Sequence, residues 1–242
     1  SYGIAIGTIA GRANQNIYTV AVGYSAGSSS QGRSAVAIGE LAGYSNQGQY
    51  SVAIGSNAGN ISQGAWATAV GAFAGSTGQQ NYAVAIGSNA GAYSQGQESV
   101  AIGSGAGYSG QNFRAVAIGS GAGMSGRNSG AVAMGYLSGS VLQGINSVAV
   151  GFQSGQLNQN IYSVAIGYNA GQASQNITCV AVGYRCGQTN QGNSSVAIGV
   201  TSGSISQGTS SVAIGNNCGY LSQGNNSIAI GIQTGQTNQA GD

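Results

Sequence analysis

The sequence contains no proline and no histidine, and only 3% of its residues are charged. The three acidic residues, Glu40, Glu98 and Asp242, lie far apart in the sequence. Acid–base catalysis, Ser-His-Asp triads and histidine metal sites therefore lack their components. The carboxylate-rich loops that bind calcium are also absent. We expect a protein that is not an enzyme and has no cofactor and no metal.

The sequence has too few charged residues to indicate a nucleic-acid partner, and its apolar runs are too short to cross a membrane. Five arginines against three acidic residues give a net charge of +2, which is not the basic patch typical of nucleic-acid binding. The longest apolar runs are about four residues, against the ~20 needed to cross a bilayer. We expect no nucleic-acid partner and no membrane insertion. The chain starts within a repeat at Ser1, so we expect a segment of a longer array.

Glycine is abundant, with 46 residues, and it is placed regularly rather than in collagen-like triplets. A second glycine lies four residues after each glycine that closes a V-A-I-G phrase, and alanine lies two residues before it. The phrase glycines follow one another at a spacing of sixteen residues, fifteen times: Gly7, Gly23, Gly39, Gly55, Gly71, Gly87, Gly103, Gly119, Gly135, Gly151, Gly167, Gly183, Gly199, Gly215 and Gly231. Such a period indicates a repeat architecture.

The phrase S-V-A-I-G has the period of a β-strand with one buried face, because its apolar side chains alternate with small ones. Sixteen residues fit one coil of a parallel β-solenoid with two short strands and two turns. We therefore predict an all-β, single-domain solenoid over residues 1–242, with fifteen coils and a length of roughly 70 Å. We expect Val and Ile, for example Ile118, to point into the core with small residues such as Ala58 and Ala106.

Glutamine occupies the eighth position after the phrase glycine in every repeat except one, where Arg127 stands. Gly or Asn usually follows, and we expect it to supply the left-handed conformation of a tight corner. Identical side chains at one position of stacked coils can form an amide ladder. The predicted rungs are Gln63, Gln79, Gln95, Gln111, Gln143, Gln159 and Gln175.

The alanine of the phrase is invariant, although a strand position that faces solvent normally varies. With Val and Ile inside, alanine would face outward beside Ser, Ala, Thr, Gly or Cys two positions earlier and the phrase glycine two positions later. We predict a flat face that packs against a second copy of the chain. The alternative is that the small residues serve twist or coil stacking. The face comprises Ala53, Ala69, Ala85, Ala101, Ala117, Ala133, Ala149 and Ala165.

The repeat resembles known families. The phrase at Asn146 to Gly151 and at Ser194 to Gly199 is similar to the head repeat of the YadA-like trimeric adhesins. The arrays also resemble glycine-rich repeats of large DNA viruses and of phage-type tail fibres. The resemblance implies a left-handed β-roll, a homo-oligomer and a place outside the cell, on the cell surface or on a virion.

Two classes of function follow from these observations. The first is a rigid structural rod that associates with itself as a fibre, filament or stalk. The alternative is an adhesin head or other binding module, for cell-surface glycans or, with less support, for ice. Aromatic side chains recur in columns, for example Tyr136, Tyr168 and Tyr184. This arrangement favours packing of rings along the rim over stacking on sugars.

Overall fold

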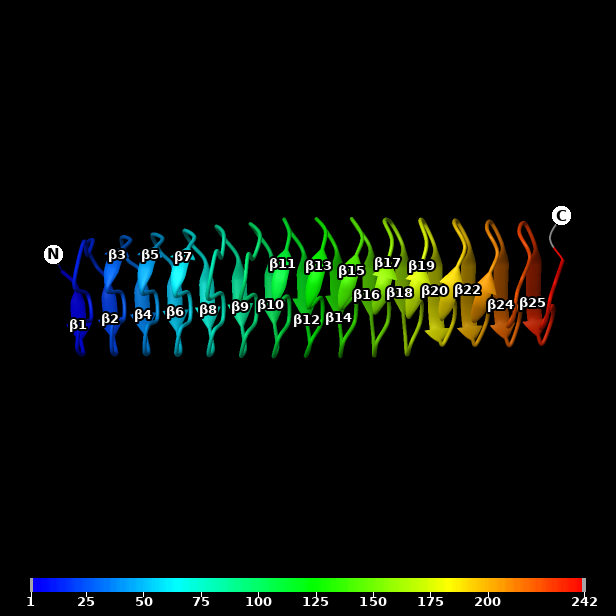
Figure 1. Cartoon of the computed structure of the whole chain (residues 1–242), viewed down its shortest axis with the longest axis horizontal. Helices are drawn as coiled ribbons and strands as arrows, with labels where there is room; N and C mark the ends of the chain where they lie inside the picture. The colour runs from blue at the N-terminus through cyan, green and yellow to red at the C-terminus, as the bar shows by residue number, and fades with distance from the viewer. Residues whose placement is uncertain (1, 241–242) are drawn as a thin grey trace. The chain divides into compact units, whose positions relative to one another are not determined.

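The computed structural model describes residues 2–240, and the described residues form an all-β fold without helices. Two compact units are present, residues 1–121 and residues 122–242. Each unit is a parallel β-solenoid in which one coil follows the next after sixteen residues (Figure 1). The predicted fold class and period are confirmed. The prediction of a single domain over residues 1–242 stays a prediction.

The V-A-I phrases form the first strand of each coil. In unit 1 these strands are β1 (Ile4–Ile6), β2 (Val20–Val22), β4 (Val36–Ile38), β6 (Val52–Ile54), β8 (Thr68–Val70), β9 (Val84–Ile86), β10 (Val100–Ile102) and β12 (Val116–Ile118). In unit 2 they are β14 (Val132–Met134), β16 (Val148–Val150), β18 (Val164–Ile166), β20 (Val180–Tyr184), β22 (Val196–Val200), β24 (Val212–Asn216) and β25 (Ile228–Ile232).

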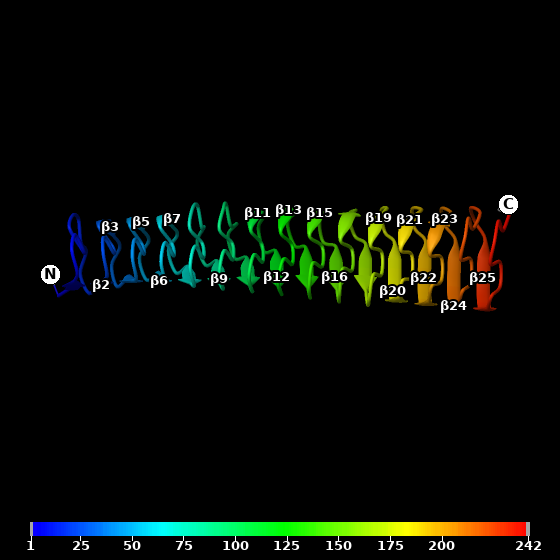
Figure 2. The same cartoon turned by 60° about the horizontal axis from the view of Figure 1, so that its bottom comes forward.

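The residues that end at the glutamine position form the second strand of a coil. In unit 1 these strands are β3 (Ser29–Gln31), β5 (Ser45–Gln47), β7 (Ile61–Gln63) and β11 (Ser109–Gln111). In unit 2 they are β13 (Ser125–Arg127), β15 (Val141–Gln143), β17 (Leu157–Gln159), β19 (Ala173–Gln175), β21 (Thr189–Gln191) and β23 (Ile205–Gln207). Some remaining coils have only isolated bridges here, such as Thr77 to Tyr93. The two rows of strands within each unit can be followed in Figure 2.

Register is uniform, because each strand residue pairs with the residue sixteen positions later. Ala149 pairs with Ala165 on the first row, and Gln159 pairs with Gln175 on the second. The middle residue of the second strand, for example Asn158 with φ 53°, has the left-handed conformation. Only the first and third residues of that strand therefore pair between coils.

The side chains that fill the coil are not those that the sequence predicted. The phrase alanine is fully buried, with an exposed fraction of 0% at Ala53, Ala117 and Ala165. The Val and Ile side chains on either side are half-buried or exposed, and Ile166 is 39% exposed. The prediction that Val and Ile, including Ile118, point inward is therefore wrong, and the alternative role of alanine in coil stacking is the one observed.

This correction also applies to the predicted contact face. The alanines of that face lie inside their own coils, where no second chain can reach them: Ala53, Ala69, Ala85, Ala101, Ala117, Ala133, Ala149 and Ala165. The physical reason is that the interior of a coil is narrow and accommodates only small side chains beside the glutamine. Other small residues, such as Ala58, Ala106 and Ser147, share the interior and are also fully buried.

The two strict glycines are required by close approach. A Cβ atom on Gly39 would lie 2.6 Å from the carbonyl oxygen of Gly55 in the next coil, and φ at Gly39 is 127°. A Cβ atom on Gly59 would lie 2.7 Å from Oε1 of Gln63 in its own coil. Side chains at the first position would block stacking, and at the second they would displace the glutamine.

The glycine that follows the glutamine does not have the predicted left-handed conformation. Positive φ occurs instead at other corners, for example at Tyr50 and Asn57, and at the middle residue of the second strands, for example at Ser62. At Gly48 a Cβ atom would lie 2.5 Å from the carbonyl carbon of Gly64. The corner needs glycine here because neighbouring coils approach closely.

Replacing Ala165 by leucine is expected to destabilise the protein by about 2 kcal/mol or more, because overpacking of a filled interior typically costs ~1–3 kcal/mol. The matched control is Ile166→Leu, on the outer side of the same strand, which we expect to change stability by less than ~0.5 kcal/mol. Urea unfolding followed by circular dichroism measures both. Equal effects of the two substitutions would contradict this assignment of inner and outer side chains.

Candidate functional site

In most coils the glutamine side chain crosses the interior and links the second strand to the first by hydrogen bonds. Gln159 is 1% exposed, and its Nε2 atom donates to the carbonyl oxygens of Val148, 2.8 Å away, and Ser163, 3.1 Å away. Val148 belongs to the first strand of the same coil, and Ser163 leads into the next coil. The amide thus satisfies backbone carbonyls that face a narrow interior.

Consecutive glutamines are also hydrogen bonded along the stack. The Nε2 atom of Gln159 also lies 3.1 Å from Oε1 of Gln175, so its two N–H groups are shared among three acceptors, and the contact between glutamines is repeated in both units. The other bonds run from Gln47 to Gln63, Gln63 to Gln79, Gln79 to Gln95, Gln143 to Gln159 and Gln175 to Gln191. Gln111, the remaining predicted rung, donates to the carbonyl oxygens of Val100 and Ala115, and its Oε1 atom has no partner among the described residues.

Arg127 occupies the glutamine position of one coil in unit 2 and is 1% exposed. Its Nε atom donates to Oε1 of Gln143 at 3.1 Å, and an Nη atom donates to the carbonyl oxygen of Ala131 at 2.6 Å. Desolvation by burial lowers the pKa of Arg127 to about 9. The guanidinium therefore continues the hydrogen-bonded column, but it carries a charge into the interior.

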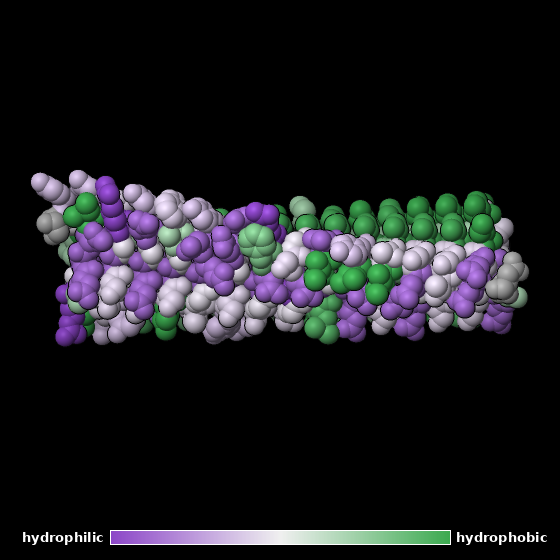
Figure 3. All heavy atoms as spheres, turned by 90° about the horizontal axis from the view of Figure 1, so that it is seen from above, coloured by the Kyte–Doolittle hydropathy of each residue, from purple (hydrophilic) through white to green (hydrophobic). Residues whose placement is uncertain are grey.

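The outer surface of the first strands consists of two columns of β-branched side chains. Exposed members include Ile54, Ile86 and Ile166, and Met134 stands in the same column. In unit 2 these columns form rows of hydrophobic side chains that run along the unit (Figure 3). Sequence analysis missed this surface because it assigned these residues to the core. The signal that could have found it is the strict smallness of the positions between them.

Aromatic side chains stack on one another from coil to coil, which confirms the predicted packing of rings along the rim. Tyr50, Trp66 and Tyr82 form one stack, with ring centroids 5.4 and 5.2 Å apart. A second stack contains Tyr136, Phe152, Tyr168 and Tyr184. The inner rings of each stack therefore have both faces covered by neighbouring rings.

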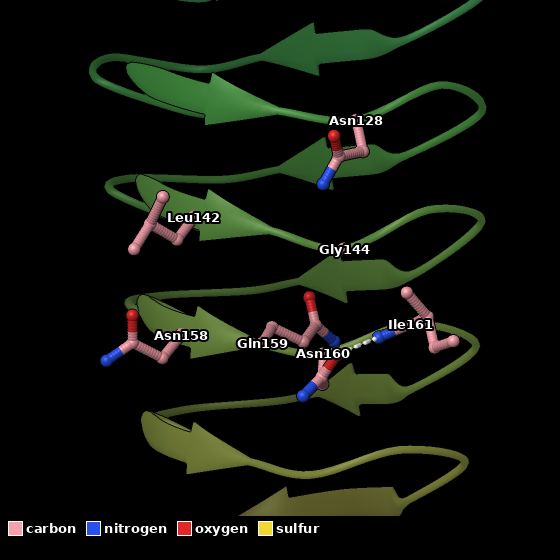
Figure 4. A pocket seen from close by; sticks show the side chains of 7 residues that line it. All are labelled: Asn128, Leu142, Gly144, Asn158, Gln159, Asn160 and Ile161. Atoms are coloured by element: carbon pink, nitrogen blue, oxygen red, sulfur yellow. Dashed lines mark hydrogen bonds between the residues drawn. The ribbon is translucent and has the colours of Figure 1, made fainter.

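A shallow depression lies on the second-strand side of unit 2. It is lined by amide and aliphatic groups: Asn128, Leu142, Gly144, Asn158, Gln159, Asn160 and Ile161 (Figure 4). The Asn160 side chain accepts a hydrogen bond from the Ile161 backbone N–H at 3.0 Å. No titratable or nucleophilic side chain lines this depression, so it has no groups for acid–base or nucleophilic chemistry.

Reactive groups elsewhere are equally sparse. Cys179, Cys186 and Cys218 are buried and free, and burial raises the pKa of the Cys179 and Cys186 thiols. No group of three or more His, Cys, Asp or Glu side chains is present within residues 2–240. In the same part of the chain, no helix is long and apolar enough to cross a membrane.

Comparison with protein families finds one match, which covers part of the chain. The YadA head domain repeat matches two stretches of unit 1, residues 47–58 and residues 80–106. No curated protein and no solved structure matches the chain. The match and the parallel solenoid together confirm the resemblance to YadA-like head repeats. The chain is thus an adhesin-like or structural β-solenoid.

Replacing Arg127 by glutamine is expected to raise the free energy of unfolding by about 1–3 kcal/mol near neutral pH, because it removes a buried charge. The folded-state pKa of Arg127 is lowered to about 9, below that of the unfolded chain. Above this pH the unfolded state binds more protons than the folded state, so the free energy of unfolding of the unsubstituted protein rises with pH. The stability difference between this protein and the Arg127→Gln variant therefore becomes smaller. Urea unfolding of both proteins at pH about 7 and about 10.5 measures the two effects. The burial of this charge would be contradicted if the variant is not more stable near neutral pH, or if the stability difference between the two proteins grows with pH.

Proposed function

We propose that the chain is a non-enzymatic structural protein that associates with further copies of itself through the outer Val and Ile columns. The observation that supports this proposal is that no other part of the described chain packs over these columns. Each first strand except β8, which carries Thr68, has two half-buried or exposed apolar side chains on its outer side, and no charged residue stands in either column. Contiguous apolar surface of this kind is typical of interaction sites in soluble proteins.

The size of this surface is compatible with a specific contact. Seven first strands at ~4.8 Å spacing and three residues at ~3.3 Å each give unit 2 a face of roughly 330 Å². The eight strands of unit 1 add roughly 380 Å² on the same basis. Each unit thus supplies nearly half of the ~800 Å² per partner of a standard protein–protein interface.

A second copy is the occupant that fits this surface best. The Val and Ile columns of a second copy have one side chain per strand, at the same spacing as the columns that they would contact. A contact made at one coil can therefore be repeated at the next. The resemblance to head repeats of trimeric adhesins supports a homo-oligomer and a location outside the cell or on its surface. A fibre, a filament and a virion stalk are the forms of assembly that the proposal includes.

We also propose that the two units continue one another as one solenoid domain over residues 1–242. The spacing of sixteen residues supports this, because it runs without insertion from Gly119 at the end of unit 1 to Gly135 in unit 2. Small-angle scattering that gives a length well short of ~70 Å for the single chain would contradict it.

Adhesion is the second candidate, because the family resemblance favours it as directly as it favours assembly. Cell-surface glycans are the proposed ligands of this alternative, although the inner aromatic rings have no free face for a sugar. Ice binding has less support, because the exposed columns contain Val and Ile rather than rows of Thr. Glycan-array binding and thermal hysteresis test these two alternatives.

The Ile166→Arg variant is expected to dissociate the assembly and keep the fold. An arginine at the centre of the face would lose its hydration in the contact, whereas on a free surface it costs less than ~0.5 kcal/mol. The control is Leu157→Arg, since Leu157 lies on the second strand of the same unit and is 41% exposed, close to the 39% of Ile166. Analytical ultracentrifugation measures mass, and circular dichroism measures the β-sheet. Normal assembly of Ile166→Arg, or equal dissociation of the control, would refute the proposal.

A further inference from the structure

The two units differ at the position that directly follows the phrase glycine. In unit 2 this position carries an aromatic column, defined as Tyr136, Phe152, Tyr168 and Tyr184, and Val200 continues it. In unit 1 the same position is small or polar in every coil after Tyr24: Glu40, Ser56, Ala72, Ser88, Ser104 and Ser120. Only unit 2 therefore has a contiguous apolar column here.

The aromatic column is preorganised. Successive ring centroids are 5.3, 5.0 and 5.3 Å apart, and the rings are within 22°, 5° and 12° of parallel. The guanidinium carbon of Arg185 lies 5.3 Å from the ring centroid of Tyr184. Rings that are already ordered in the single chain lose little conformational entropy when a partner covers their exposed edges.

The column borders the Val and Ile face. Strand β20 runs from Val180 to Tyr184, so Tyr184 follows Val182 at the end of the strand, with Gly183 (φ 124°) between them. The pairing of β20 with β22 extends to Tyr184 and Val200, whereas β16 and β18 end two residues before Phe152 and Tyr168. In these coils of unit 2 the aromatic column therefore adjoins the Ile column, two residues further along the chain.

The additional column changes the area available for contact. Five residues at ~3.3 Å, in place of three, in the five coils from Tyr136 to Val200 widen the unit 2 face from roughly 330 Å² to roughly 490 Å². Aromatic side chains also supply a disproportionate share of the binding energy of protein interfaces. Unit 2 thus offers both more area and stronger contact residues than unit 1.

We propose that the aromatic column is the dominant contact between copies of the chain and that it sets the affinity of their association. This inference rests on the proposed function, because it concerns the same face. A second copy fits better than a sugar, since stacking covers the inner ring faces and leaves edges that continue the Val and Ile columns. The Val and Ile columns of another copy have the same spacing from coil to coil, so they can pack against those edges.

The test compares two pairs of substitutions in the full chain. The first is Phe152→Ser with Tyr168→Ser, which installs the residue that unit 1 carries at Ser88 and Ser104. The matched control is Trp66→Ser with Tyr82→Ser, which removes two rings from the other stack. Sedimentation over a dilution series gives the dissociation constant of each, and circular dichroism verifies the fold. We expect the first variant to associate at least about 10-fold more weakly, a difference of about 1.4 kcal/mol, and the control to change less than about twofold.

Two results would overturn the inference and leave the proposed function standing. One is an unchanged dissociation constant for the first pair while Ile166→Arg still dissociates the assembly, and the other is an equal loss in the control pair. If neither Ile166→Arg nor the aromatic pair affects association, both proposals fail. If the double variant does not fold, Phe152→Ser alone replaces it in the same comparison, since it leaves Tyr168 stacked on Tyr184.

Discussion

The hydrogen bonds of one buried glutamine per coil determine the rest of this structure. Gln159 and its equivalents reach from the second strand to a carbonyl oxygen of the first strand, so the distance between the two walls is the length of one side chain. A coil of this width has room only for small residues, which are Ala, Ser, Cys, Gly and Thr, at its other strand positions that face inward. The second glycine is strict because it lies against the amide, and larger apolar residues are left for the outer surface.

Much of this fold can be predicted from the sequence, because period and strand alternation are local properties. The sixteen-residue spacing predicts parallel coils in register, and the invariant position of glutamine predicts that its side chains lie in one column. Alternation in S-V-A-I-G also shows that Ala points away from Val and Ile. It does not show which side is inside. The usual expectation that large apolar residues are buried assumes an interior wide enough to hold them, and Ala165 lies inside while Ile166 lies outside.

A stricter reading of the small residues would have reversed that assignment. Positions confined to Ala, or to Ser, Ala, Thr, Gly and Cys, are typical of tight packing, and the glycine four residues before each glutamine is part of the same steric arrangement. The association of copies has no comparable local signal. It depends on a surface that becomes visible only when the alanines are known to be buried and the Val and Ile columns to be uncovered. The difference between the units at Tyr168 and Ser88 has meaning only next to that surface.

Thiol accessibility tests the central claim most directly, since it reports the inside, the outside and the contact face in one measurement. Cysteine is introduced singly by Ala165→Cys, Ile166→Cys and Leu157→Cys, in a chain whose own cysteines are buried. The rate of reaction with a maleimide is then followed over a range of protein concentrations. The account predicts that Ala165→Cys is unreactive throughout, that Leu157→Cys reacts at all concentrations, and that Ile166→Cys is protected only where copies associate. Concentration-dependent protection at position 165, with position 166 unreactive even in the dilute single chain, would contradict it.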